Sequence, residues 1–181
     1  MEKMRLISGK WGGQILIAPK GKTTRPTTDR NREALFSMLA ARLDFDAAHV
    51  LDGFAGSGAL GLEALSRGAA QCLFVEHDRA ACAAIKQNIA TCGAQAVTKL
   101  LPLDARKADF ANRKFDLVFL DPPYGQGLSE AVLLRLHGAL SPDAVLVVEE
   151  DKRTAFVVPD GYGETERRTK GDTQLIFLTR A

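Results

Sequence analysis

The chain has 181 residues, of which 46% are hydrophobic and 25% charged. This length and composition allow one folded domain with its own core, and they exclude a chain too polar to fold. No stretch reaches the roughly 20 apolar residues that a bilayer span requires. The first residues lead into no long apolar run of the kind that a secretory leader contains. We therefore predict a single cytoplasmic domain over residues 1–181, with no membrane partner.

Cysteine and histidine are few and scattered, with three of each in the chain. The odd number of cysteines and their wide spacing indicate reduced thiols rather than a disulfide framework. Neither residue type recurs at the spacing of metal ligands, so we predict no structural or catalytic metal. The residues concerned are Cys72, Cys82, Cys92, His49, His77 and His137.

Positive charge gathers at the N-terminus. Residues 1–32 hold eight Lys or Arg against two acidic residues, a net charge of +6, so the total of +2 leaves −4 for the rest of the chain. Clustered positive charge favours a polyanionic partner, because binding neutralises phosphates and releases their counterions. The same distribution also fits a merely solvated surface, and charge alone does not decide between the two.

The first elements that we predict are a β-hairpin and a helix. Short apolar runs at 5–8 and 14–18 flank a glycine-rich turn at 9–13, which is the pattern of a hairpin. After a polar segment, apolar residues recur at helical spacing from Arg30 to about Leu43. Asp29 stands where a helix cap is expected. The apolar side of this helix should pack on the rest of the protein.

From His49 onward, short apolar strands alternate with helices, which predicts a parallel sheet covered on both faces. Two final extended runs lack a helix between them and must therefore pair antiparallel. This α/β arrangement resembles the class I fold of methyltransferases that use S-adenosylmethionine. We expect a Rossmann-like core over 45–181, preceded by a basic N-terminal part, the hairpin and helix, over 1–44. The predicted strands lie at 50–51, 72–75, 97–101, 117–120, 145–148, 163–169 and 174–179, and the helices at 60–67, 79–92 and 129–140.

A glycine loop follows the first of these strands. Gly56, Gly58 and Gly61 match the G-x-G-x-x-G fingerprint of dinucleotide-binding folds, and Glu76 lies about 20 residues further on. Asp52, however, ends the strand just before the glycines, where it would repel the pyrophosphate of a dinucleotide. The ammonium and sulfonium of S-adenosylmethionine would instead be attracted. We therefore predict this cofactor, with the glycines giving it close access to the backbone.

Further cofactor contacts are predicted around the same loop. Glu76 ends the next strand and can accept hydrogen bonds from both ribose hydroxyls, and His77 borders the same pocket edge. Phe54 lies in the glycine loop itself. Asp104 follows a later strand, where such folds place an acceptor for the adenine amino group. An aspartate at such a position is as often a helix cap or turn former, and both interpretations of Asp104 stay open.

The predicted reaction centre is the tetrad Asp121-Pro122-Pro123-Tyr124, which ends an apolar strand. The carboxyl ends of the strands in an open α/β sheet form one ligand cleft, so this rigid turn should face the glycine loop. An exocyclic amine on a base is a weak nucleophile, because its lone pair is delocalised into the ring. Asp121 and the carbonyl of Pro122 can accept its two hydrogens and free the lone pair. Tyr124 offers a face on which the base can lie.

Other interpretations compete with an amino methyltransferase for a nucleic-acid base. The tetrad alone also fits an ordinary strand exit with a packed tyrosine, but its position after the glycine loop and Glu76 favours catalysis. A DNA adenine or cytosine amino methyltransferase would need a separate target-recognition region, for which the chain has no spare length. A noncatalytic RNA-binding protein would not need Asp52, Glu76 and Asp121 together. An NAD-dependent enzyme would have to accommodate a pyrophosphate beside Asp52.

Two N-terminal segments narrow the substrate. Residues 5–13, Arg-Leu-Ile-Ser-Gly-Lys-Trp-Gly-Gly, and residues 25–36, which begin Arg-Pro-Thr-Thr-Asp-Arg, resemble the N-terminal signatures of the RsmD family. Members of that family methylate the amino group of a guanine at position 966 of bacterial 16S rRNA. The resemblance covers nearly the whole chain and implies an S-adenosylmethionine-dependent rRNA (guanine-N2-)-methyltransferase. Its partner would be 16S rRNA in the small ribosomal subunit or an assembly intermediate, and we expect a monomer.

The same resemblance implies roles for residues of the N-terminal part. Thr28 and Arg30 would lie beside the methionine end of the cofactor and hold its carboxylate. The N-terminal hairpin would contact RNA, although Trp11 fits equally well as an anchor of the hairpin on the protein body. The predicted RNA contacts are Arg5, Lys10, Trp11 and Arg25.

Overall fold

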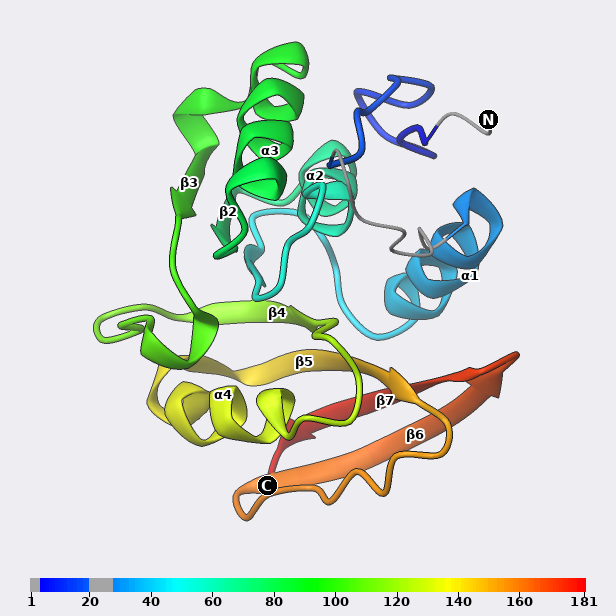
Figure 1. Ribbon diagram of the computed structural model, residues 1–181, viewed down its shortest axis with the longest axis vertical. Coiled ribbons are helices and arrows are strands. Elements are labelled where there is room, and N and C mark those ends of the chain that lie inside the picture. Colours follow the sequence, from blue (N-terminus) through cyan, green and yellow to red (C-terminus); the bar gives the residue numbers. More distant parts are fainter. Residues whose placement is uncertain (1–3, 20–27) are drawn as a thin grey trace.

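The computed structural model describes residues 4–19 and 28–181 of the chain. Within these residues, seven strands form one sheet in the order β3-β2-β1-β4-β5-β7-β6 (Figure 1). β1 to β5 pair parallel, and β7 pairs antiparallel with both β5 and β6. The predicted fold, a mostly parallel sheet that ends in an antiparallel hairpin, is confirmed. The strands are β1 His49–Asp52, β2 Gln71–Val75, β3 Thr98–Leu101, β4 Phe115–Leu120, β5 Leu140–Asp151, β6 Tyr162–Lys170 and β7 Thr173–Arg180.

Helices cover both faces of the sheet. α1, α2 and α3 pack with the N-terminal segment on one face, in a core around Phe36, Phe74 and Phe119. α4 packs on the other face, beside β4 and β5 (Figure 1). The α-helices are α1 Asp29–Ala40, α2 Ala59–Ser66, α3 Arg79–Thr91 and α4 Leu128–Leu136, and the short 3-10 helices are η1 Gln95–Val97, η2 Ala105–Lys107 and η3 His137–Ala139. None of the described helices is long and apolar enough to cross a membrane.

The start of α1 corrects one prediction. Thr28 caps the helix in place of Asp29, because its hydroxyl accepts a 3.3 Å hydrogen bond from the backbone N–H of Asn31. Asp29 instead begins the first turn, where its carboxylate accepts hydrogen bonds from Arg5 at 3.2 Å and from Arg32 at 2.8 Å. The buried Arg32 also donates to the backbone carbonyl of Arg5. The N-terminal segment is therefore tied to the start of α1.

Two helix ends lie earlier than predicted. α1 ends at Ala40 rather than near Leu43, and Phe45 packs into the core where the chain turns toward β1. α4 ends at Leu136, because Leu140 already begins β5 and pairs with β4. Apolar periodicity alone does not separate the last turn of a buried helix from the first residues of a buried strand.

The N-terminal segment, residues 4–18, folds back on itself with a minimum of strand pairing. The predicted hairpin contains one isolated antiparallel bridge, between Arg5 and Ile15, and backbone hydrogen bonds from Leu6 N to Gln14 O, from Leu16 N to Met4 O and from Gly13 N to Leu6 O. Other backbone groups of the segment bond to the protein body. Glu63 of α2 accepts hydrogen bonds from the backbone N–H groups of Ile7 at 2.7 Å and Ser8 at 3.1 Å. The segment is thus held mainly by α2, which satisfies donors that a longer ladder would have paired.

Candidate active site

Four carboxylates meet at the carboxyl ends of neighbouring strands. Side chains alternate between the faces of a strand, so a residue two positions after a core residue points to the same face. The core residues concerned are Val50, Phe74, Phe119 and Val147, all beneath α1, α2 and α3. The carboxylates two positions later, which we call the carboxylate row, are Asp52, Glu76, Asp121 and Glu149. The predicted Asp52, Glu76 and Asp121 are therefore placed along one edge of the sheet.

Asp52 ends β1 inside the protein, where 3% of its surface is exposed. Its Oδ2 accepts a 3.0 Å hydrogen bond from the backbone N–H of Gly61 in α2. Burial and the charge of Glu76 raise the pKa of Asp52 from 3.8 to about 7, although the Gly61 bond lowers it. No ion pair joins Asp52 to a cation among the described residues. A bound cation would therefore stabilise the charged form of this carboxyl group.

Glu76 holds the glycine loop against the end of β2. Its Oε2 accepts a 2.9 Å hydrogen bond from Gly56 N, and its Oε1 accepts one of 2.8 Å from Asp78 N. Gly56 has a left-handed φ of +56°, and a Cβ built on it would meet no atom within 4 Å. Gly61 has a different role, since a Cβ there would lie 2.5 Å from the Phe74 ring. The loop therefore combines open space beside Gly56 with close packing of α2 on the sheet.

The other predicted residues of the cofactor pocket surround this loop. Gly58 is the left-handed N-cap of α2, with a φ of +78°. Phe54 is partly buried against the core beneath α4. His77 is exposed, and its Nδ1 lies 3.5 Å from Glu76 Oε1. Contact of these side chains with a cofactor stays a prediction.

Asp104 caps the short helix η2 after β3. Its Oδ1 accepts a 2.9 Å hydrogen bond from Arg106 N, and its Oδ2 pairs with the Arg106 guanidinium at 2.6 Å. The side-chain bond from Arg106 lowers the pKa of Asp104 to about 2. The carboxylate thus has the turn-forming role, and an adenine contact stays a prediction.

Asp121 and Glu149 are neighbours in the carboxylate row, at the ends of the adjacent strands β4 and β5. β4 and β5 pair in parallel up to the last residue of β4, so Asp121 and Glu149 stand next in register. Burial, together with the charges of Glu149, Asp52 and Glu150, raises the pKa of Asp121 well above its usual range. Burial also raises the pKa of Glu149, whereas the hydrogen bond from Tyr124 lowers it. The acids in the middle of the row therefore hold their protons more tightly than free carboxyl groups do, and a bound cation would favour their charged forms.

Two glutamates of β5 hold the turn that follows β4. Glu149 Oε1 accepts a 3.1 Å hydrogen bond from the hydroxyl of Tyr124. Glu150 is buried, and its Oε1 accepts a 2.9 Å hydrogen bond from Gly125 N. Pro122 is buried, whereas 42% of the surface of Tyr124 is exposed. The tyrosine ring is thus accessible to a flat ligand, while its hydroxyl is already engaged.

Neither Glu149 nor Glu150 is among the site residues predicted from sequence. Their signal is nevertheless present, because an apolar strand ends in these two acids just as other strands end in Asp52 and Asp121. The rule that ligands bind at strand carboxyl ends applies to all parallel strands of such a sheet.

Residues predicted from the N-terminal signatures lie around the start of α1. Thr28 serves as its N-cap, and Arg30 is exposed in its first turn. The Arg5 side chain is exposed and pairs with Asp29 at 3.2 Å. Arg25 lies outside the described residues. No hydrogen bond or ion pair joins Thr28, Arg30 or Arg5 to the carboxylate row in the described part of the chain, so their cofactor and RNA contacts stay predictions.

The turn at residues 9–13 is fastened to Ser66, the last residue of α2. The backbone N–H of Lys10 donates to the Ser66 carbonyl at 2.8 Å, and that of Trp11 donates to its hydroxyl at 3.0 Å. Trp11 packs against the core, and the Lys10 ammonium lies 4.3 Å from the centre of its ring. This packing supports the anchoring role of Trp11. Because α2 begins beside the glycine loop and ends at Ser66, the turn lies about 12 Å from that loop.

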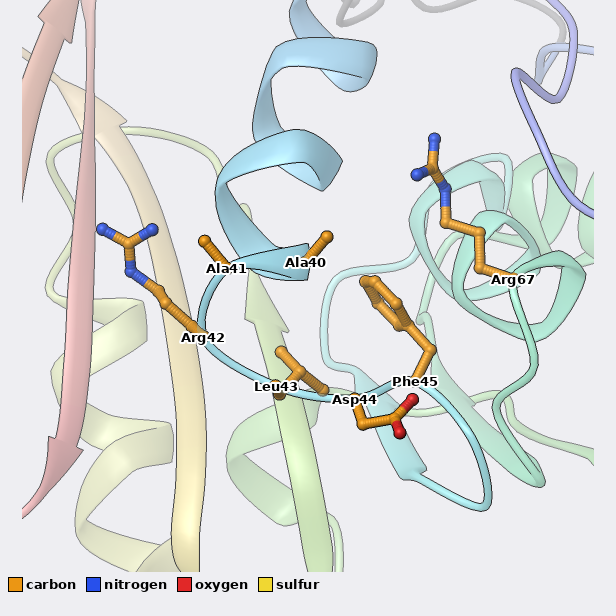
Figure 2. A pocket seen from close by; sticks show the side chains of 7 residues that line it. All are labelled: Ala40, Ala41, Arg42, Leu43, Asp44, Phe45 and Arg67. Atoms are coloured by element: carbon orange, nitrogen blue, oxygen red, sulfur yellow. The ribbon is translucent and has the colours of Figure 1, made fainter.

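A separate hollow of about 540 Å³ opens at the C-terminal end of α1 (Figure 2). Residues 40–45 and Arg67 line it, with Arg42 and Arg67 on opposite sides. Both guanidinium groups are engaged, Arg42 with Glu166 and Arg67 with Glu63. The chain leads from this hollow into the first residue of β1, so it lies at the sheet edge away from the carboxylate row. It contains none of the predicted site residues.

The sheet order, the glycine loop and the carboxylate row define a class I methyltransferase. The chain belongs to the family described as Conserved hypothetical protein 95, whose model matches residues 4–179. It is 41% identical over 184 residues to Ribosomal RNA small subunit methyltransferase D of Escherichia coli strain K12, covering 98% of this chain and 90% of that protein. It is 35% identical over 175 residues to the protein of the same name from Haemophilus influenzae, covering 93% of this chain and 90% of that protein.

A solved structure shows the same relationship. The Escherichia coli protein yhhF, described as a candidate methyltransferase, matches with a TM-score of 0.84 at 35% identity, over 99% of this chain and 98% of that one. The predicted membership of the RsmD family is confirmed. The names of the relatives give no support to the alternative of a DNA amino methyltransferase.

Proposed function

We propose that this chain transfers a methyl group from S-adenosylmethionine to the exocyclic amino group of a guanine in 16S rRNA, at position 966. The observation that carries the proposal is the arrangement of acids in the middle of the carboxylate row. Asp121 stands between Asp52 and Glu149 along the sheet edge, and none of the three pairs with a cation among the described residues. The relatives named as rRNA small subunit methyltransferases support an RNA substrate.

The residues at the ends of β1 and β2 fit the cofactor. Asp52 is a buried acid that pairs with no cation in the described part of the chain, Glu76 is an acceptor for ribose hydroxyls, and open space lies beside Gly56. A dinucleotide would instead bring its pyrophosphate against Asp52. S-adenosylmethionine supplies an electrophilic methyl group on a sulfonium, so that a nitrogen–carbon bond forms while a carbon–sulfur bond breaks and the amine loses a proton. The further contacts that we propose for it are Phe54, Gly58, His77, Asp104, Thr28 and Arg30.

Asp121 and Pro122 act on the target amine. The Asp121 carboxylate and the Pro122 carbonyl accept hydrogen bonds from its two hydrogens. This takes the nitrogen lone pair out of conjugation with the ring and leaves it free to attack the methyl group. Positive charge develops on that nitrogen during transfer, and the surrounding carboxylates stabilise it without having to reorganise. The raised pKa of Asp121 suits it to take the proton that the methylated amine releases. Tyr124 presents its exposed ring to the face of the base.

The N-terminal part would contact the RNA around the target nucleotide. The turn that presents Lys10 and Trp11 is anchored at the far end of α2, so it would reach flanking rRNA rather than the target base. Arg5 and Arg25 are the other RNA contacts that we propose. The natural substrate would be the small ribosomal subunit or an assembly intermediate. The enzyme would act on it as a monomer in the cytoplasm.

The test is methyl transfer to small ribosomal subunits from a bacterial strain that lacks the enzyme. With radiolabelled S-adenosylmethionine, we expect label in N2-methylguanosine after nuclease digestion, and none with Asp121→Ala. Subunits from the parent strain are the control and should accept no label, because their target is already methylated. Label in adenosine, or transfer to naked DNA, would contradict the proposal.

A further inference from the structure

The tetrad Asp121-Pro122-Pro123-Tyr124 recognises an amine without identifying the base that carries it. Adenine, cytosine and guanine all present an exocyclic amine with two hydrogens. They differ at the ring nitrogen beside that amine, since guanine has an N1–H donor where adenine and cytosine have an unprotonated acceptor. A protein group that distinguishes guanine must therefore be an acceptor placed next to the group that binds the amine.

Glu149 occupies that position. It stands next to Asp121 in the register of β4 and β5, on the same face of the sheet, and it is partly buried. Its Oε1 accepts the hydroxyl hydrogen of Tyr124, whose ring is the proposed platform for the base. No described residue donates a hydrogen bond to its Oε2. The second oxygen is thus available beside both the platform and the amine-binding carboxylate.

We propose that Glu149 selects guanine by accepting a hydrogen bond from its N1–H, while Asp121 and the Pro122 carbonyl bind the adjacent amine. The inference rests on the proposed function and names the residue that sets its specificity. Adenine or cytosine would place a ring-nitrogen lone pair against the Glu149 carboxylate, leaving both groups unsatisfied. The hydroxyl of Tyr124 already occupies Oε1, so Oε2 is the oxygen that accepts from N1–H.

The test uses subunits reconstituted with 16S rRNA that carries either guanine or 2-aminopurine at the target nucleotide. 2-Aminopurine keeps the 2-amino group but has an unprotonated N1. For each enzyme the readout is the ratio of kcat/KM on guanine to kcat/KM on 2-aminopurine, and comparison of variants cancels the intrinsic reactivity of the two bases. In Glu149→Gln the side-chain amide can donate to the bare N1, so we expect the ratio to fall about 100-fold from the wild-type value.

Two further variants distinguish selection of the base by Glu149 from a role in which Glu149 only holds the turn through Tyr124. Tyr124→Phe removes the hydroxyl bond but keeps the Glu149 carboxylate, and its ratio should stay near that of the wild type. Glu149→Ala removes the acceptor without adding a donor, so its ratio should also fall. Glu33→Gln makes the same chemical change on the exposed side of α1 and is the matched control, with an unchanged ratio.

The outcomes distinguish this inference from the proposed function. If the wild type methylates guanine but Glu149→Gln and Glu149→Ala keep its ratio, the inference fails and the proposed function stands. If the ratio falls equally in Tyr124→Phe, Glu149 acts only by holding the tyrosine, and the inference also fails. If the wild type transfers no methyl group to guanine-containing subunits, the proposed function itself fails, and the inference with it.

Discussion

Two buried acids beside α2 have opposite surroundings. Glu63, within the helix, accepts hydrogen bonds from two backbone N–H groups of the N-terminal segment and from the guanidinium of Arg67. Asp52, below the start of the helix, accepts one from Gly61 N and has no cation beside it among the described residues. The first acid fastens the N-terminal segment to α2, whereas the second has a raised pKa and would be stabilised in its charged form by a cationic ligand. Burial of an acid therefore indicates a binding site only where the protein supplies no counter-charge.

The largest effect should come from the carboxylate row itself. We expect Asp121→Asn to lower kcat by about 10³-fold, because it removes the charged acceptor of the target amine. Single-turnover methylation of small subunits measures the loss. Asp143→Asn, an exposed position in β5, is the matched control. A loss of less than tenfold would show that Asp121 is not the principal acceptor.

The attachment of the N-terminal segment by Glu63 should contribute to the stability of the protein. We expect Glu63→Ala to lower the free energy of unfolding by about 3 kcal/mol, because it leaves buried donors of the N-terminal segment and Arg67 unpaired. Urea denaturation measures this change. Glu33→Ala, exposed on α1, should change stability by no more than about 0.5 kcal/mol. Equal stability of the two variants would mean that Glu63 does not hold the segment.

Asp52 should behave in the opposite way to Glu63. Its folded-state pKa is raised from 3.8 to about 7, so the folded protein binds this proton more tightly than the unfolded chain does. The stability that comes from this proton is complete below pH 3.8 and is lost as the pH rises through 7. Above that pH the buried charge destabilises the ligand-free protein. We therefore expect Asp52→Asn to stabilise the free protein by roughly 1–3 kcal/mol at pH 8, and by less at pH 5. Destabilisation at pH 8 in urea denaturation would overturn this interpretation.

The same carboxyl group should control how cofactor affinity depends on pH. A cation prefers the charged form of Asp52, so the affinity for S-adenosylmethionine should rise as the pH increases and level off above about 7. The rise should approach tenfold per pH unit below that value. Equilibrium dialysis between pH 5 and 8 measures it, with Asp52→Asn as the comparison. A wild-type curve as flat as that of Asp52→Asn would show that this carboxylate does not control the affinity for the cofactor.

Much of the carboxylate row could be predicted because parallel strands bring their carboxyl ends to one edge whatever the details of packing. Asp52, Glu76 and Asp121 each follow an apolar run, and the alternation of strands and helices placed them together. Glu149 was missed although it follows the predicted strand 145–148, because the prediction relied on the glycine loop, the tetrad and the N-terminal signatures, and none of these includes it. Its relation to Asp121 depends on the register between β4 and β5.

The attachment of the N-terminal segment could not be predicted. Residues 5–13 resemble a family signature, but the groups of α2 and α3 that bind the segment lie 55 to 71 residues away along the chain, as in the bonds from Ile7 to Glu63 and from Ile17 to Asn88. Neither Glu63 nor Asn88 has a local pattern that distinguishes it from an ordinary helical polar residue. The cap of α1 shows the same limit on a smaller scale, since Thr28 and Asp29 are both good capping residues.

By itself, the sequence determined the alternation of strands and helices, the antiparallel end of the sheet, and the edge at which Asp52, Glu76 and Asp121 meet. These features follow from local periodicity and from the geometry of parallel strands. Only the tertiary structure decided which buried acids meet a cation among the described residues and which meet other acids. Glu63 meets Arg67 and a distant backbone, whereas Asp121 meets Glu149 and Asp52. The reason is physical, because the charge state of a buried group depends on every group packed around it, and those groups come from distant parts of the chain.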